Sequence, residues 1–207
     1  GTYKATTFSV GNLASSSGTY TLSGGVLTAG TEYIGKSGTG TLSQTGGTNT
    51  ASTAIVIGNS SGSSGTYSMA GGVLNGSAAL TVRNDSNATG TFSGYGTVGL
   101  TGALTNNGRI VADGSGTQSN VLNLSSFASV NNTIDNPTTG GTNGWFAINK
   151  GMLTLKPLSI TTGTNTFNWG EASGDATIDL VNSGRFAFTD VTQAGTLAGS
   201  LLARDRT

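Results

Sequence analysis

The segment that decides the fold is GTYTLSGGVLT at residues 18–28, because close variants of it return along the chain. The variants are GTGTLSQTGG at residues 38–47, GTYSMAGGVLN at residues 65–75 and, less closely, GTFSGYGTV at residues 90–98. A double glycine falls at 24–25, 46–47 and 71–72, which gives a period of 22 and then 25 residues. Such a period is typical of proteins that stack one structural unit on the next.

A second short motif lies between these blocks. It reads FSVG at residues 8–11, YIG at 33–35, IVIG at 55–58 and LTVR at 80–83. Each repeat thus holds two or three runs rich in β-branched and aromatic residues, separated by turns of glycine, serine and asparagine. We expect each run to form a short β-strand.

Alternation within a block assigns the two faces of its strand, since successive side chains of a strand point to opposite sides. Aligned on the first glycine of each block, the predicted inward columns are Tyr20, Gly40, Tyr67, Phe92 and Leu22, Leu42, Met69. The predicted outward columns are Thr19, Thr39, Thr66, Thr91 and Thr21, Thr41, Ser68, Ser93. A coil of this size cannot bury its apolar face alone, so each strand should pair in parallel with its equivalent one coil later. The sequence therefore predicts an all-β fold, a parallel β-helix or β-solenoid with coils of 22–25 residues.

The whole chain, residues 1–207, is predicted to be a single β-solenoid with two styles of coil. Residues 1–103 carry the regular Gly/Thr repeats. Residues 104–207 carry a looser apolar-x-Asn-x-Gly pattern at 104–111, 148–155 and 180–188, whose wider spacing predicts longer loops.

Composition excludes several classes of function. Nine basic and nine acidic residues leave no net charge, so a basic surface for nucleic acid is missing. The absence of His and Cys removes the commonest general base, the thiolate nucleophile and His- or Cys-ligated metal sites. No apolar run reaches the roughly 18 residues that span a bilayer, so membrane insertion is not expected. We predict no cofactor.

The iterated pattern of Gly-Thr-apolar-Thr-apolar blocks, double glycines and Leu-Thr-Asn-x-Gly strands resembles the autotransporter/PEP-CTERM-associated repeat family of bacterial cell-surface and secreted proteins. The similarity covers residues 7–112 well and the remainder in style. It implies a right-handed parallel β-helix, located outside the cell or on the bacterial surface, that acts as a stalk, a matrix or filament subunit, or an adhesin passenger. The family has no general catalytic motif to carry over.

Three carboxylates gather at the end of the looser half, where Glu171, Asp175 and Asp179 lie within nine residues. Such a group could hold a cation such as Ca2+ or flank a glycosidic bond. Calcium takes about six to eight oxygen ligands, and this segment lacks the dense Asp and Asn spacing that supplies them. Solvated turn charges are the favoured interpretation, and no metal site is predicted.

A polysaccharide-active enzyme is a further hypothesis, because long β-helices can mount acid–base groups along a groove. The first 82 residues hold only three charged side chains, Lys4, Glu32 and Lys36, which is too few for acid–base chemistry in a groove. The charged residues that could converge in the second half, and that we interpret as surface charges, are Lys150, Lys156, Asp175, Asp179 and Arg185. We predict no catalytic residues and no enzyme.

Binding of a surface polysaccharide is the leading alternative function. Aromatic rings stack on sugar faces, and the candidates for such contact are Trp145, Phe146 and Trp169, in the segments GWFAI and TFNW. A core position for one ring of each pair competes with this interpretation. The threonine columns also suggest an ice-binding surface, although strand preference alone favours threonine there.

The ends of the predicted rod should expose unpaired backbone groups, which natural solenoids cover with a cap or a partner. Residues 1–10 already read as coil sequence, and residues 201–207 are too few to close a coil. We therefore expect end-to-end self-association, or further coils of a longer chain on both sides.

Overall fold

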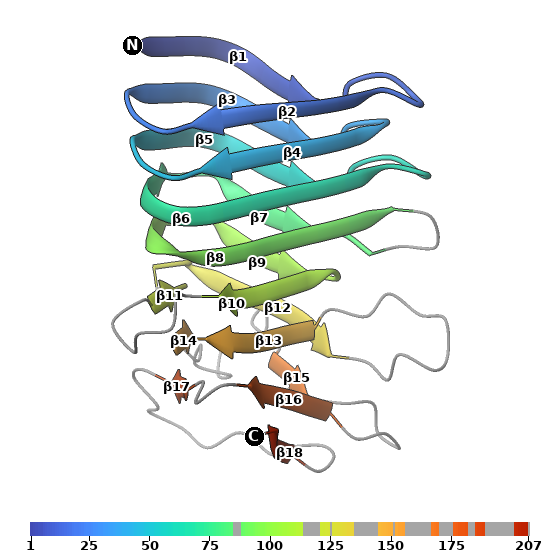
Figure 1. Ribbon diagram of the computed structural model, residues 1–207, viewed down its shortest axis with the longest axis vertical. Coiled ribbons are helices and arrows are strands. Elements are labelled where there is room, and N and C mark those ends of the chain that lie inside the picture. Colours follow the sequence, from blue (N-terminus) through green and yellow to red (C-terminus); the bar gives the residue numbers. More distant parts are fainter. Residues whose placement is uncertain are drawn as a thin grey trace.

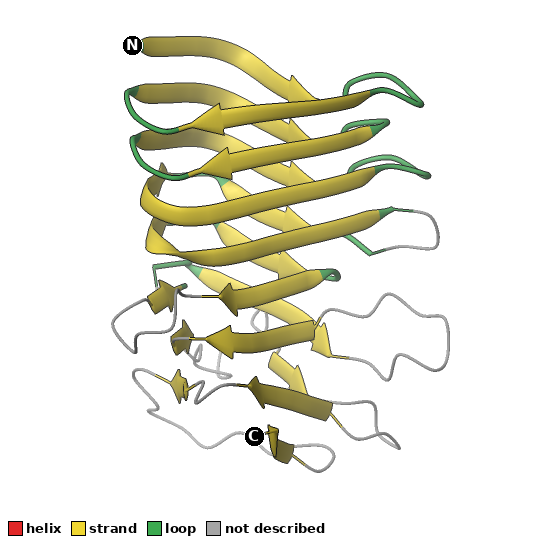
Figure 2. Cartoon of the chain, in the orientation of Figure 1, coloured by secondary structure: helices red, strands yellow, loops and turns green. Residues whose placement is uncertain are grey.

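The computed structural model describes residues 1–84, 88–113, 121–124, 126–134, 145–150, 152–155, 167–169, 176–181, 185–188 and 201–206. Side chains are described in residues 1–84, 88–112, 122–124 and 126–128. The regular structure of these residues is β-strand, and Figure 2 shows short turns between the strands. No described helix has the length and apolar character needed to cross a membrane.

The strands of the regular half follow one another closely. They are β1 (Thr2–Val10), β2 (Ser17–Leu22), β3 (Val26–Ile34), β4 (Thr39–Gln44), β5 (Thr48–Ile57), β6 (Ser64–Gly76), β7 (Ala79–Val82), β8 (Thr89–Leu100) and β9 (Ala103–Asn106). The remaining strands are β10 (Arg109–Asp113), β11 (Val121–Asn123), β12 (Ser129–Ile134), β13 (Trp145–Lys150), β14 (Met152–Leu155), β15 (Phe167–Trp169), β16 (Ala176–Val181), β17 (Arg185–Phe188) and β18 (Leu201–Arg206).

The strands stack in parallel columns along the long axis of the molecule (Figure 1). One column runs through β2, β4, the first part of β6, the first part of β8, β10, β13, β16 and β18. A second runs through the first parts of β1, β3 and β5, the second parts of β6 and β8, then β11, β14 and β17. The third runs through the second parts of β1, β3 and β5, then β7, β9, β12 and β15. The predicted all-β, parallel β-solenoid is confirmed.

The length of a coil is the sequence offset between paired residues. Thr41 lies 22 residues after its partner Thr19 and 25 residues before its partner Thr66. Farther along, Trp145 lies 36 residues after its partner Arg109. The chain between paired strands is therefore longer in this part of the solenoid.

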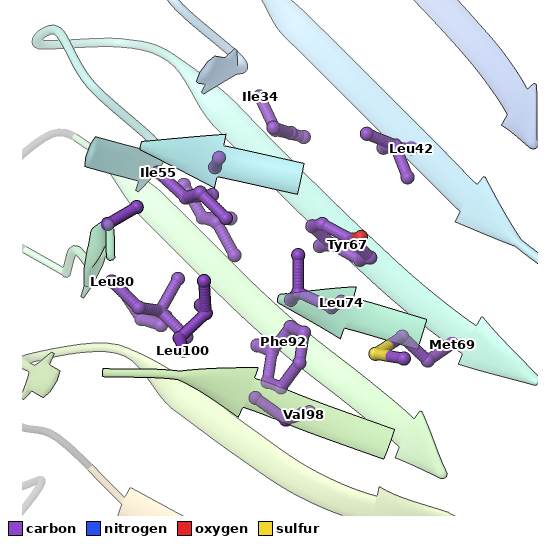
Figure 3. Packing of buried hydrophobic residues seen from close by; sticks show 14 of the residues in the cluster. Ile34, Leu42, Ile55, Tyr67, Met69, Leu74, Leu80, Phe92, Val98 and Leu100 are labelled. Carbon is purple, nitrogen blue, oxygen red and sulfur yellow. The ribbon is translucent and has the colours of Figure 1, made fainter. Parts of the chain in front are cut away.

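In the part of the chain with described side chains, the core fills the space between the columns with alternate residues of the strands. Figure 3 shows these residues converging from neighbouring coils, and Leu42, Leu74 and Phe92 are fully buried among them. Tyr67 packs edge-to-face on Phe92 with ring centroids 5.3 Å apart. Full burial of one such side chain contributes about 1.5–3 kcal/mol, so the stacked columns supply the stability that a single coil lacks.

The predicted columns are wrong in one coil, the one that holds β4. Leu42 pairs with Tyr20 and Tyr67, and Gln44 lies between Leu22 and Met69. The prediction aligned this block on its first glycine, which shifts β4 by two residues relative to β2 and β6. Each side chain of β4 keeps its face under this shift but is given the wrong neighbours. Alignment on the double glycine that ends each block gives the observed register, because the turn before β4 differs in length while the turn after it does not.

Gly40, which the prediction had placed in the aromatic column, stacks instead on Gly18 and Gly65. A Cβ on Gly40 would strike the amide nitrogen of Gly35 and lie 2.5 Å from the Val10 carbonyl oxygen. This column of glycines therefore lies where a strand begins against the turn of the neighbouring coil, and the close approach excludes a side chain.

Candidate functional site

The outer edge of β1 is the first candidate site. Among the described residues β1 pairs with β3 only, over the register Thr2 to Val26 through Val10 to Ile34. In Figure 1 β1 lies at the N-terminal end of the stack with no strand beyond it. A parallel strand that pairs on one side leaves backbone N–H and C=O groups on its other side free to pair with another strand.

The apolar interior is uncovered at this end of the stack. Tyr3 is aligned with Leu27, a fully buried residue, yet Tyr3 is 51% exposed because no coil covers it. Its ring packs edge-on against Phe8 with centroids 6.0 Å apart, and Phe8 packs on Tyr20 at 4.9 Å. Tyr3, Phe8 and Tyr20 form what we call the end cluster, in which Phe8 is buried, Tyr20 is half-buried and the exposed ring of Tyr3 is suited to the apolar face of another coil.

A second feature is the outward surface of β2, β4, β6 and β8, which we call the hydroxyl face. Its columns are Ser17, Thr39, Ser64, Thr89, then Thr19, Thr41, Thr66, Thr91, then Thr21, Ser43, Ser68, Ser93. All are exposed or half-buried, and the Thr89 hydroxyl donates to the Ser64 hydroxyl at 3.1 Å. The third column of strands mixes hydroxyls and apolar residues at its outward positions, with Thr31 and Thr81 beside Ala54 and Val56, so it is less uniform than the hydroxyl face. Ice binding by this face stays the disfavoured alternative to a plain strand preference for threonine.

A third feature is a group of polar side chains inside the core, which we call the polar cluster: Glu32, Gln44, Asn49 and Tyr67. Each is fully buried. The Asn49 side-chain nitrogen Nδ2 donates to Glu32 Oε2 and to the Tyr67 hydroxyl, each at 3.0 Å. The Tyr67 hydroxyl in turn donates to Gln44 Oε1 at 2.6 Å.

Gln44 connects this cluster to the backbone. Its Nε2 donates to the carbonyl oxygens of Val73 at 3.0 Å and Gly47 at 3.4 Å. Two buried oxygens of the cluster have no hydrogen-bond partner, Glu32 Oε1 and Asn49 Oδ1. Both belong to the pair of side chains already joined by a hydrogen bond.

Burial dominates the electrostatics of the polar cluster. Loss of hydration disfavours the carboxylate and raises the pKa of Glu32 from 4.5 to about 7, against the smaller lowering effect of the hydrogen bond from Asn49. Burial, followed by the negative charge of Glu32, raises the pKa of Tyr67, so its hydroxyl stays a donor. Glu32 is thus the group of this cluster that can change charge near neutral pH.

Sequence reasoning missed the polar cluster. It counted Glu32 among the few charges of the first half, without placing it in the core. The signal was present: EYI at residues 32–34 aligns with FSV at 8–10 and IVI at 55–57, so Glu32 occupies the inward position of Phe8 and Ile55. The shift in the β4 block hid Gln44 in the same way.

The predicted glycan-contact residues lie on strands whose backbone alone is described. Phe146 in β13 is aligned with Ile110, and Trp145 with Arg109, so neighbouring positions continue an inward and an outward column. Trp169 in β15 is aligned with Ile134. Contact of these aromatic residues with a surface polysaccharide stays a prediction.

The acidic and charged candidates of the second half fall largely outside the described residues. Glu171, Asp175 and Lys156 lie there, while Lys150, Asp179 and Arg185 are placed by their backbones in β13, β16 and β17. Asp179 is aligned with Ala147 of β13 on one side and with Arg204 of β18 on the other. The structure brings no described pair of these candidates together.

Comparison with known proteins adds no relative to this picture. No family model matches the chain, and no curated protein or solved structure is significantly similar to it. The resemblance to the autotransporter/PEP-CTERM-associated repeat family therefore stays a prediction, and the fold is what the structure establishes.

Proposed function

We propose that this chain is a non-enzymatic structural β-solenoid of the bacterial surface or extracellular matrix, which extends as a rod and associates through its end. The observation that carries this proposal is the open edge of β1 with the end cluster beside it. The occupant of that edge is another parallel coil, supplied by a second copy of the chain or by a preceding coil of the same polypeptide.

The chemistry of the end favours a coil over other partners. The edge offers a ladder of backbone donors and acceptors along Thr2–Val10, and the exposed ring of Tyr3, which packs on the buried Phe8, offers apolar area beside it. Each described coil of the regular half joins the next through the same combination of paired strands and inward apolar side chains. Contact between unlike ends does not close on itself, so copies would add head to tail into an open filament.

The test is sedimentation velocity across the micromolar range, with electron microscopy of the heaviest species. We expect wild-type mass to rise with concentration and Tyr3→Lys to suppress that rise, since an inward-pointing charge at an edge opposes strand addition. Leu13→Lys is the matched control, because Leu13 is also an exposed hydrophobic residue, at 69%, but lies in the turn between β1 and β2.

Loss of association in both variants would mean that general surface hydrophobicity, not the end cluster, drives it. A strictly monomeric wild-type particle would exclude the second copy as the occupant. A native polypeptide with no coil before residue 1, together with that monomer, would overturn the proposal.

A further inference from the structure

The hydrogen-bond donors of the polar cluster are completely used. Asn49 Nδ2 donates its two hydrogens to Glu32 and Tyr67, and the Tyr67 hydroxyl donates its hydrogen to Gln44. Gln44 Nε2 donates its two hydrogens to backbone carbonyl oxygens. Two acceptors are left over, Glu32 Oε1 and Asn49 Oδ1, and a buried acceptor without a donor is costly.

A hydrogen carried by one of these oxygens and donated to the other would satisfy both. We propose that Glu32 binds a proton at Oε1 and donates it to Asn49 Oδ1, while Oε2 accepts from Asn49 Nδ2, so that acid and amide form a closed two-point pair inside the solenoid core. Folding and proton binding are then coupled, and the pair acts as a pH-sensitive lock between β3 and β5. This inference is independent of the assembly proposed above.

The surroundings of Glu32 favour a proton over a cation. The elements packed against it contribute Phe8 from β1 and Ile55 from β5, which are apolar, and Asn49, which is neutral. Tyr67 from β6 is the titratable group that faces it in the described interior, and burial keeps that hydroxyl neutral. A bare cation needs about six oxygen ligands, and the cluster leaves only two oxygens without a partner, whereas a proton on Glu32 Oε1 needs one acceptor, which Asn49 Oδ1 supplies.

The pH range follows from the carboxyl group. Its ordinary pKa is 4.5 and burial raises it to about 7. Below pH 4.5 both the folded and the unfolded chain carry the proton, and between the two pKa values only the folded chain does. The stability that the proton gives is therefore complete below pH 4.5 and is lost as the pH rises through about 7.

The sequence makes a direct observation possible, because Glu32 and Glu171 are its only glutamates. The folded full chain, synthesised with 13C at the glutamate side-chain carboxyl, would give one glutamate signal in the variant Glu171→Gln, and that signal belongs to Glu32. We expect its chemical shift to titrate with a midpoint near 7 and to be that of a neutral acid well below it.

Two results would overturn the proposal. A midpoint at the ordinary 4.5 would mean that the carboxylate is ionised in the folded chain at mildly acidic pH. A carboxylate that stays ionised, with a melting temperature that rises on addition of sodium or calcium chloride, would place a cation at Oε1 instead. The carboxyl titration needs no substitution in the core, because Glu32 itself is unchanged in the chain that is measured.

Discussion

Glu32, Gln44 and Asn49 each stand at a core position that apolar residues hold in the neighbouring coils. Phe8 and Ile55 flank Glu32 in its column. Burial of a polar group without a partner costs more than its hydrogen bond returns, so such residues persist when they satisfy one another. Here the three positions fall within one coil, where Tyr67 bonds to Gln44 and Asn49 and Asn49 bonds to Glu32, so mutual hydrogen bonds offset part of the cost.

At the residue scale this pairing predicts how stability depends on pH. Glu32→Gln replaces the acid by a neutral amide whose N–H can donate to Asn49 Oδ1 at every pH. Relative to this variant, the wild-type free energy of unfolding should fall by about 3 kcal/mol as the pH rises from 4.5 to 7. Urea unfolding at a series of pH values measures it.

Glu171→Gln is the matched control for that experiment, because it removes the other glutamate of the chain. It should leave the difference between low and neutral pH unchanged. If Glu32→Gln unfolds with the same pH dependence as the wild-type chain, the acid–amide pair does not carry the effect.

At the scale of strands and turns, the repeats predicted the fold class and the alternation of faces, because both follow from local spacing. The register also depends on the length of each turn, and the predicted register was wrong where the turn before β4 is shorter. Leu42 was assigned the neighbours that belong to Gln44. A two-residue shift is invisible to alternation, since it returns every side chain to the same face.

The sequence predicts one of the candidate sites and not the other, for a similar reason. The open edge at β1 was expected, because residues 1–10 read as an ordinary coil. The polar cluster was not, because it depends on which columns meet in the interior, and that is a property of the three columns together. Its donors come from β4, β5 and β6, which the sequence separates by turns.

Gly40 tests the register of β4 directly. If it lay between Tyr20 and Tyr67, a larger side chain would fill a gap and stabilise the chain. In the structure its Cβ would meet backbone atoms of Gly35 and Val10, so Gly40→Ala should destabilise by about 3 kcal/mol.

Gly24→Ala is the control for that substitution, because a Cβ at Gly24 meets nothing within 4 Å. Its effect should stay within about 0.5 kcal/mol. Thermal unfolding followed by far-UV circular dichroism compares the two variants with the parent. A Gly40→Ala chain as stable as the Gly24→Ala chain would show that the column of Gly18, Gly40 and Gly65 is assigned wrongly.

At the scale of the whole molecule, the solenoid is nearly one-dimensional, because each coil contacts mainly the coils before and after it. Strand β5 is held on both sides, by β3 and by β6 and β7, whereas β1 is held by β3 alone among the described strands. Local stability should therefore differ along the stack.

Native-state hydrogen exchange measures this difference. Amides of β1 that bond to β3 should exchange faster than the amides of β5, since opening β1 breaks one interface and opening β5 breaks two. If copies stack end to end, protection of β1 should rise with protein concentration in the wild-type chain and stay low in Tyr3→Lys, while β5 stays unchanged in both. Equal protection of β1 and β5 in dilute protein would mean that the coils open as one cooperative unit, and the nearest-neighbour account of this solenoid would be wrong.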